Sequence, residues 1–553
     1  MKVLSRLTSS LEKIFIDEEI ESYAKIERIS ALRGERIAIQ LMYKVVMDME
    51  EGVYRKLFCP TVEGSLAEYA RIRRIEHMPV TKPVGDVPDD NYLRTTAGVY
   101  PDVLLPLNYG GRVFSDHRLL SSIWIDIEIP KDAPEGDTIL TVKLISEEGE
   151  TVVTESVTVE VIGANLPEPE LYYTRWLHTD CLASHYHVSV WSKRHWEIIE
   201  NFAREAVRSG INTLLTPLIT PSLDGPRMLT QLVKVKKVGE EYSFDFSRVG
   251  KWIAMCDRVG IKYFEISHLF TQGGATNAPR ITATVDGEEK MIFSYETDAR
   301  DPEYRRFLRA LMTAFIKYMK RRGDDARCNF HISDEPPKRC LENYRYAKSC
   351  VADILAGYKF IDALSDFEFY TEGLVECPVP LTRAITPFTE AGVEHLWTYY
   401  CCGPTNENFS NSFIAMPSYR TRSIGIQLYK YNIEGFLHWG FNFYNNRESD
   451  APLNPYLEPS GENWVPAGDP FIVYPAPDGT AYSSIREEVT YHALEDIRAM
   501  KLCEKYYSHG EVVAAIEEEL GYLLDFRGSV RSSATMARVR ERINEMIKTA
   551  IKR

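Results

Sequence analysis

The sequence predicts a multidomain protein: an N-terminal antiparallel β-sandwich, then a (β/α)8 barrel of the TIM type, then a C-terminal helical extension. Three observations predict this order. At 553 residues, the chain is too long for one ordinary hydrophobic core. Its first part shows the two-residue period of β-strands, and the longer second part alternates strand-like and helix-like segments. We expect three domains, at residues 1–165, 166–510 and 511–553.

The predicted sandwich has short strands separated by turns. Between residues 123 and 129, isoleucines alternate with Trp124, Asp126 and Glu128, which is typical of a strand with one buried face. A series of such strands favours a β-sandwich. The segment 163–170 contains two prolines, which interrupt both strands and helices, so we place the domain boundary there.

The predicted barrel begins near Tyr172, and strands and helices then alternate, as in parallel βαβ units. The clearest helix begins at Pro302 after the N-cap Asp301, carries three cations in its last turn and ends at Gly323. The strand 327–333, the fourth of the barrel, follows it, and then a helix at 338–355. Later strands are expected at 359–364, 395–400, 435–444 and 471–474.

The C-terminal extension contains one amphipathic helix, at residues 535–551, whose apolar stripe includes Met536, Val539 and Ile543. We expect this stripe to pack on the protein's own surface, against the barrel, rather than to bind a partner.

Composition excludes several classes of function. The net charge of −15, with no basic block, argues against a nucleic-acid partner. No apolar run has the length of a signal peptide or a membrane span, so a cytoplasmic location is expected. Ten cysteines without a Cys-x-x-Cys pair support neither a disulfide scaffold nor a thiolate zinc site. His185 and His187 lack a third ligand, so we expect no metal and no cofactor. The oligomeric state stays open.

Two adjacent acids, Asp334 and Glu335, end the fourth barrel strand and precede Pro336 and Pro337. Barrel enzymes place their chemistry at the carboxyl ends of the strands, so the pair is a candidate acid/base site, although such pairs also occur on solvated surfaces. The following proline favours an extended Glu335. Regular pleating puts the two side chains on opposite faces, so they meet only if the strand twists or bulges here.

The pair also suggests a reaction. Ordinary retaining glycosidases need a second carboxylate about 5 Å away as nucleophile, and the strand 435–444 carries none near its carboxyl end. A substrate with a 2-acetamido group supplies its own nucleophile, the carbonyl oxygen. Such a substrate needs an acid and a carboxylate that orients the amide, and adjacent Asp and Glu fit this. If the two lie close, their like charges raise one pKa, as a general acid requires.

Aromatic and polar side chains near the ends of the predicted strands are candidates for binding a sugar. Aromatic rings cover the apolar faces of sugars, and polar groups fix the hydroxyls. The predicted aromatic residues are Trp397, Tyr399 and Trp439, and the predicted polar residues are His178, His438 and Asn442.

Five passages resemble glycoside hydrolase family 123, the β-N-acetylgalactosaminidases that act on glycosphingolipid-type sugars. They lie at residues 173–180, 266–272, 333–336, 435–440 and 468–475, and include Ser333-Asp334-Glu335-Pro336 and Gly435-Phe436-Leu437-His438-Trp439-Gly440. The resemblance implies a sandwich followed by a (β/α)8 barrel and retaining, substrate-assisted removal of terminal N-acetyl-β-D-galactosamine. It implies Glu335 as general acid/base and Asp334 as the residue that orients the acetamido group. It also implies an aromatic cage and a tyrosine on the acetamido carbonyl, for which we take Trp439 and Tyr399.

Two other interpretations remain open. A glycosidase with an enzyme carboxylate as nucleophile, Glu372 or Glu407, would act on a plain β-galactoside. A sugar-binding protein without catalysis would keep the aromatic residues and need neither acid. In each case the partner is a small carbohydrate.

Overall fold

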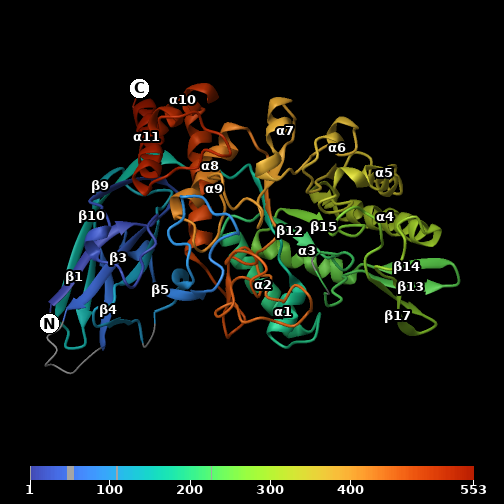
Figure 1. Ribbon diagram of the computed structural model, residues 1–553, viewed down its shortest axis with the longest axis horizontal. Helices are drawn as coiled ribbons and strands as arrows, with labels where there is room; N and C mark the ends of the chain where they lie inside the picture. The colour runs from blue at the N-terminus through green and yellow to red at the C-terminus, as the bar shows by residue number, and fades with distance from the viewer. Residues whose placement is uncertain (1, 47–54, 108–109, 224, 226, 553) are drawn as a thin grey trace.

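The computed structural model describes residues 2–46, 55–107, 110–223, 225 and 227–552. The N-terminal strands lie at one end of the long axis of the molecule, and the hairpin strands β13 (Lys234–Val238) and β14 (Glu241–Asp245) lie at the other (Figure 1). Within the described residues, no helix is long and apolar enough to cross a membrane.

The N-terminal part contains two five-stranded sheets. The first has the order β1 (Lys2–Ser9), β3 (Arg36–Val46), β8 (Ser121–Glu128), β5 (Ala70–Val80), β6 (Gly98–Leu105). The second has the order β2 (Arg28–Arg33), β10 (Thr151–Asn165), β9 (Gly136–Ser146), β4 (Arg55–Glu63), β7 (Val113–Asp116). One apolar core, which includes Ile123, Ile125, Val142 and Val159, draws residues from both sheets. The prediction of an antiparallel sandwich needs one correction, because β2 and β10 pair in parallel.

The second part of the chain forms a seven-stranded parallel sheet. Its order is β19 (Lys359–Phe360), β18 (Cys328–Phe330), β15 (Tyr263–Ile266), β12 (Thr213–Thr216), β11 (Tyr172–Arg175), β21 (Gly435–His438), β20 (Trp397–Tyr399). All six pairings are parallel, as the strand–helix alternation predicts. Among the strands of this sheet, β18, which leads to Asp334, is the fourth along the chain from Tyr172.

Helices alternate with these strands. They are α1 (Thr179–His185), α2 (Lys193–Arg208), α3 (Ser247–Val259), α4 (Pro302–Arg322), α5 (Leu341–Ser349), α6 (Glu368–Thr371), α7 (Thr386–Glu390), α8 (Ser418–Lys430) and α9 (Ile485–Cys503). The ends of α4 confirm the prediction: the Asp301 side chain accepts hydrogen bonds from two amides of the first turn, and Gly323 adopts φ +77°.

The two edge strands of this sheet meet the same extended segment, residues 378–381. On one side, the Val379 amide donates to Asp362 O (3.2 Å), and Leu364 N donates to Val379 O (3.1 Å). On the other side, Trp397 N and Tyr399 N donate to the carbonyls of Pro378 and Pro380 (3.1 and 3.2 Å). A segment that bonds to both edges requires the sheet to curl.

Hairpins and short strands extend this framework. β16 (Ile281–Val285) and β17 (Glu288–Phe293) join β13 and β14 in a four-stranded sheet. β22 (Tyr474–Pro475) and β23 (Ala481–Tyr482) form a two-stranded sheet. The expected strand at 471–474 is therefore wrong in all but its last residue.

The C-terminal helices are α10 (His509–Leu520) and α11 (Ser533–Ile551). The predicted apolar stripe of α11 is buried, but its surroundings are wider than predicted. It packs against α8 and α9 and also against β2 and β10 of the sandwich, so it covers both parts of the molecule.

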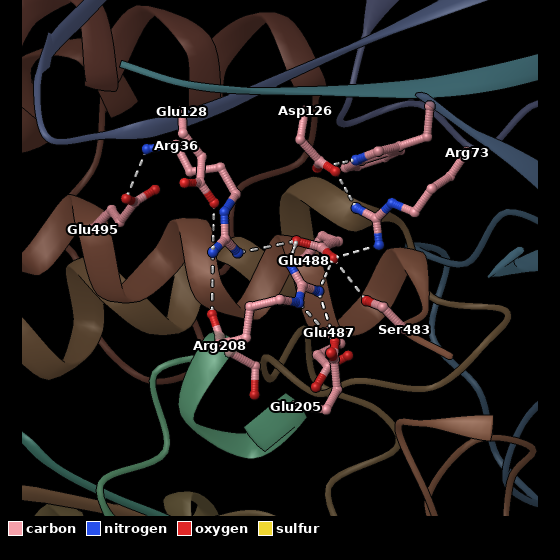
Figure 2. Close-up of polar contacts among 12 residues, drawn as sticks. Arg36, Arg73, Asp126, Glu128, Glu205, Arg208, Ser483, Glu487, Glu488 and Glu495 are labelled. Carbon is pink, nitrogen blue, oxygen red and sulfur yellow. Dashed lines mark hydrogen bonds and ion pairs between the residues drawn. The ribbon is translucent and has the colours of Figure 1, made fainter. Parts of the chain in front are cut away.

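A buried ion cluster joins the sandwich to the second part (Figure 2). The Glu488 carboxylate of α9 pairs with Arg73 of β5 (2.8 Å), Arg36 of β3 (3.4 Å) and Arg208 at the end of α2. Arg73 also pairs with Asp126 of β8. Burial alone would raise the pKa of Glu488, but Arg73, Arg208 and Arg36 outweigh it and hold the pKa well below its usual value.

Candidate active site

Asp334 and Glu335 lie in the loop after β18, four and five residues beyond its last residue, Phe330. The strand is shorter than the predicted 327–333. The backbone is nevertheless held on both sides, because Gly273 N donates to Asp334 O (2.7 Å) and Glu335 N donates to Ala363 O (2.9 Å). Asp334 is buried at 4% exposure, whereas Glu335 is exposed. One acid is therefore shielded and the other faces solvent.

Glu335 does not have the extended conformation that we expected before a proline. Its φ is +44°, in the left-handed region that non-glycine residues rarely adopt. Such a conformation costs about 1–3 kcal/mol and persists only where the surroundings impose it, as the Ala363 hydrogen bond does here. The left-handed residue also breaks the pleat, which would otherwise place the two acids on opposite faces.

Tyr399, at the end of β20, connects with this pair. Its hydroxyl donates a hydrogen bond of 2.5 Å to Glu335 Oε1, and its ring is buried. Burial raises the pKa of Tyr399 well above its usual value, and the nearby charges of Glu335 and Asp334 raise it further. Tyr399 therefore keeps its proton and acts as a hydrogen-bond donor, and both acids are near enough to act on it electrostatically.

Gln272 contacts the buried acid. It belongs to the loop after β15, and its Nε2 donates to Asp334 Oδ2 at 2.8 Å. A neutral amide donor fixes the orientation of the carboxylate and leaves its charge in place. The pair thus receives one donor for each acid, Gln272 for Asp334 and Tyr399 for Glu335.

A charged network lies beneath the pair, inside the curled sheet. The His331 ring contacts Glu265 Oε1 (2.7 Å) through Nε2 and Asp362 Oδ1 (3.1 Å) through Nδ1. Burial would lower the pKa of His331, but the hydrogen bonds to Asp362 and Glu265 raise it to about 9. Thr174 and Trp176 donate to the two oxygens of Glu265, both at 2.6 Å. A protonated His331 between two carboxylates therefore fixes the backbone just before Asp334.

Three of the buried groups, His268, His331 and Asp362, have ligand atoms within 4.8 Å of one another, which suggests a metal site. Both ring nitrogens of His331, however, already face carboxylates, and its raised pKa keeps a proton on each. His268 stacks on this ring, with 4.2 Å between ring centres. The donor set fits an imidazolium better than a metal ion, so we assign no metal to it.

An aromatic wall follows β21. Trp439 lies 5.3 Å from Phe443 and 5.5 Å from Trp464 between ring centres, and its indole N–H donates to Asp469 Oδ2 at 2.9 Å. Trp464 is only half-buried. The structure thus places Trp439 at the same end of the sheet as Asp334 and gives it two aromatic neighbours.

The three predicted polar residues lie at this end too, but the side chains of His178 and Asn442 are engaged within the protein. Nδ1 of His178 accepts from Arg227 (2.9 Å), and Nε2 donates to Trp439 O (2.7 Å). Burial, and then the charge of Arg227, lowers the pKa of His178 to about 3. The Asn442 amide bonds to both backbone groups of His178. His438 is fully buried, and burial followed by the charge of Arg175 lowers its pKa well below its usual value. These residues therefore support the site from within the protein.

Trp397 does not lie beside the acids. It occupies the first position of β20, fully buried at the amino end of the sheet, where it stacks on Tyr172 at 5.2 Å. A Cβ on Gly435 would come within 1.9 Å of its ring, so the glycine makes room for it. The sugar-binding role predicted for Trp397 needs correction, because the residue packs the opposite end of the sheet.

Sequence reasoning missed several residues of the site: Glu265, Gln272, Asp362, Arg227, Asp469 and Trp464. Gln272 and Asp469 carried a usable signal, because each lies in one of the five passages that resemble family 123. Glu265 and Asp362 carried a weaker signal, because each lies in or just after a short strand.

Comparisons with known proteins show the family and the fold of the chain. Residues 176–503 match the model of the glycoside hydrolase 123 catalytic domain. A family 123 glycoside hydrolase from Clostridium perfringens, whose structure was analysed for glycolipid glycan hydrolysis, has a TM-score of 0.74 at 16% identity, over 100% of this chain and 98% of that chain. A β-glucuronidase from Parabacteroides merdae gives only 0.33 at 10% identity, over 90% of this chain and 52% of that chain. No curated protein sequence matches significantly. The first likeness shows a shared fold, and because the family model matches more than half of the chain, the protein belongs to glycoside hydrolase family 123.

Proposed function

We propose that the protein removes terminal N-acetyl-β-D-galactosamine from glycolipid-type glycans, with retention of configuration and with the 2-acetamido group as nucleophile. One observation carries this proposal: a buried Asp334 is adjacent to an exposed Glu335, and each accepts a hydrogen bond from its own donor. Membership of family 123 supports a glycosidase. The relative from C. perfringens, studied for glycolipid glycan hydrolysis, supports the substrate class.

In the first step, Glu335 in its acid form gives its proton to the glycosidic oxygen, and the bond from this oxygen to the anomeric carbon breaks. The acetamido carbonyl oxygen forms the new bond to that carbon. Asp334 accepts the acetamido N–H and stabilises the positive charge that develops on the ring formed. Gln272 holds Asp334 in this orientation.

In the second step, the Glu335 carboxylate takes a proton from water while the water oxygen attacks the anomeric carbon. The acetamido carbonyl leaves, and two inversions give net retention. Glu335 is exposed enough to reach both the leaving group and the water. Tyr399 donates to Glu335 in the free protein, and we assign it to the acetamido carbonyl in the complex.

The alternative with an enzyme nucleophile finds little support. Glu372 pairs with Arg345 (3.1 Å) and Glu407 with Arg527 (3.5 Å), and both acids are about half-exposed, in surface ion pairs. The other acids near Asp334, Glu265 and Asp362, are fully buried in the His331 network. The absence of a free second carboxylate among these residues favours the acetamido mechanism.

The predicted architecture belongs to the same proposal. We infer that residues 378–381 act as an eighth parallel strand, because they bond to both edges of the seven-stranded sheet and would close it into a (β/α)8 barrel. The end of β10 at Asn165 supports the predicted division between a sandwich at 1–165 and a barrel at 166–510, whereas the predicted start of the helical extension 511–553 falls in the first turn of α10.

The test compares the wild type with Glu335→Gln and Asp334→Asn on an aryl N-acetyl-β-D-galactosaminide and on the plain β-galactoside. We expect turnover of the acetamido substrate only, and a fall on the order of 10² or more in each variant. Glu372→Gln serves as the control and keeps wild-type rates. Turnover of the plain galactoside would favour an enzyme nucleophile, and an active Glu335→Gln would exclude Glu335 as the acid.

A further inference from the structure

A cavity adjoins the acid pair. Its volume is about 500 Å³, and its lining comprises Ser222, Leu223, Gly225, Thr271, Gln272, Arg280 and Tyr295. Gln272 is the residue that donates to Asp334, and the carbonyl of Thr271 accepts from the Ser333 hydroxyl (2.8 Å). The cavity and the acid pair therefore share one wall, formed by Thr271 and Gln272.

Arg280 is the charged residue of this lining, and its charge is uncompensated. Its Nε and Nη2 atoms are buried and have no hydrogen-bond partner, and no carboxylate of the described residues forms an ion pair with it. Its guanidinium carbon lies over the Tyr295 ring, 5.7 Å from the ring centre. A half-buried guanidinium with unused donors is costly unless an anion meets it.

The surrounding polar groups are already bonded within the protein. The Ser222 hydroxyl donates to Phe270 O (3.1 Å), and the Thr271 hydroxyl accepts from Asn277 N (3.2 Å). Arg280 thus brings a positive charge to the described lining of the cavity, in a chain whose net charge of −15 otherwise repels anions. Its planar fork matches the two oxygens of a carboxylate or the three of a sulfate.

We propose that this cavity is a subsite for an anionic group on the glycan, a carboxylate-bearing sugar or a sulfate ester, and that Arg280 binds it. The subsite rests on the proposed function, since it places the anion next to the sugar that the acid pair releases. Tyr295 covers one side of the guanidinium. The protein would then prefer acidic glycans over neutral ones with the same terminal sugar.

The experiment measures kcat/KM for three oligosaccharides with the same terminal N-acetyl-β-galactosamine: one neutral, one with a carboxylate-bearing branch and one with a sulfate ester. The charged-to-neutral ratio is compared in the wild type, Arg280→Lys and Arg280→Gln. We expect the ratio to fall about 10- to 100-fold in Arg280→Gln, mainly through KM, as the loss of charge-assisted hydrogen bonds implies. The ratio for Arg280→Lys should lie between those of the wild type and Arg280→Gln, because lysine keeps the positive charge but lacks the planar guanidinium.

Arg300→Gln is the matched control, because Arg300 is also an arginine over a tyrosine ring, Tyr346 (4.9 Å), but it lies on an exposed surface outside the cavity. Its ratio should equal that of the wild type. A ratio that Arg280→Gln leaves unchanged overturns the subsite. The carboxylate and sulfate substrates show which of the two groups the subsite accepts.

A binding measurement separates this proposal from the proposed function. Inorganic sulfate is titrated into the wild type and Arg280→Gln at constant ionic strength, with chloride as the reference. If no acetamido substrate turns over but sulfate binding depends on Arg280, the proposed function fails and the anion site stands. Equal sulfate binding by the two proteins overturns the anion site whatever the turnover.

Discussion

At the scale of single residues, the site depends on two acids in different surroundings. Asp334 is buried and held by Gln272, so it is suited to orient a substrate group, while Glu335 is exposed and suited to exchange protons with substrate and water. The left-handed backbone at Glu335 interrupts the regular pleat, which would place the two side chains on opposite faces of the sheet. Local backbone strain thus serves the chemistry.

Tyr399→Phe removes the hydroxyl that donates to Glu335 in the free protein and that we assign to the acetamido carbonyl in the complex. A hydrogen bond to a group that carries charge during the reaction is worth about 1.5–3 kcal/mol, so we expect kcat to fall about 10- to 100-fold with little change in the melting temperature. Initial rates on the aryl acetamido substrate give the answer. Tyr400→Phe is the control, because the Tyr400 ring packs on Phe436 and His438 (5.0 and 5.4 Å) and its residue follows Tyr399 directly. Equal losses in both variants would contradict a special role for Tyr399.

At the scale of elements, the short strands of the sheet meet through the His331 network. Glu265 is the last residue but one of β15, His331 follows β18 and Asp362 follows β19, so three neighbouring strands contribute to one charged group. This network ties the end of β18 to its neighbours at the point where the chain turns toward the acid pair. It therefore supplies rigidity where the catalytic geometry needs it.

His331→Gln tests the charge of this network. The folded pKa of about 9 exceeds the unfolded value of about 6.5, so the stabilisation is fully present below pH 6.5 and is lost as the pH rises to 9. We expect the wild-type free energy of unfolding to fall by about 3 kcal/mol more than that of the variant across this window. Urea unfolding at several pH values measures the difference.

His195→Gln is the control for this prediction. Burial lowers the pKa of His195, so this ring is neutral over the same window and its removal should leave the pH slope unchanged. If the free energy of unfolding of His331→Gln depends on pH as that of the wild type does, His331 is not protonated in the folded protein.

The sequence predicts those elements whose signals are local. The helix α4 has its cap, its cationic last turn and its stop within one segment, and the prediction has the right ends. The adjacent acids were found for the same reason. Glu265 and Asp362 lie 66 and 31 residues from His331, so only the assembled sheet brings them together. Trp397 was misplaced because the alternation of a strand does not show which of its ends carries the site.

At the scale of the whole molecule, the sandwich and the second part share a buried ion cluster, in which Glu488 meets arginines from three different elements (Figure 2). Helix α11 packs against strands of the sandwich and against helices of the second part. We therefore expect the two parts to unfold together rather than as independent domains.

Glu488→Gln tests this junction. The variant leaves three arginines with a neutral partner in a buried site, so we expect a loss of about 3–5 kcal/mol in the free energy of unfolding. Glu128→Gln, which removes the exposed partner of Arg36, is the control and should change it by less than about 1 kcal/mol. Because the folded pKa of Glu488 is lowered, its contribution is present above the unfolded pKa and disappears as the pH falls. Equal effects of the two variants, by thermal unfolding at pH 7, would contradict this account.

The segment 378–381 also affects the tendency of the protein to aggregate in solution. Its prolines use only their carbonyls toward β20, and Val379 uses both backbone groups toward β19, so one short segment covers two sheet edges at once. Edges that lose such a cover expose rows of unpaired amides and carbonyls, to which strands of another molecule can add. A nick or a substitution in this segment would therefore lead to aggregation between copies of the chain, and not only to a weaker fold.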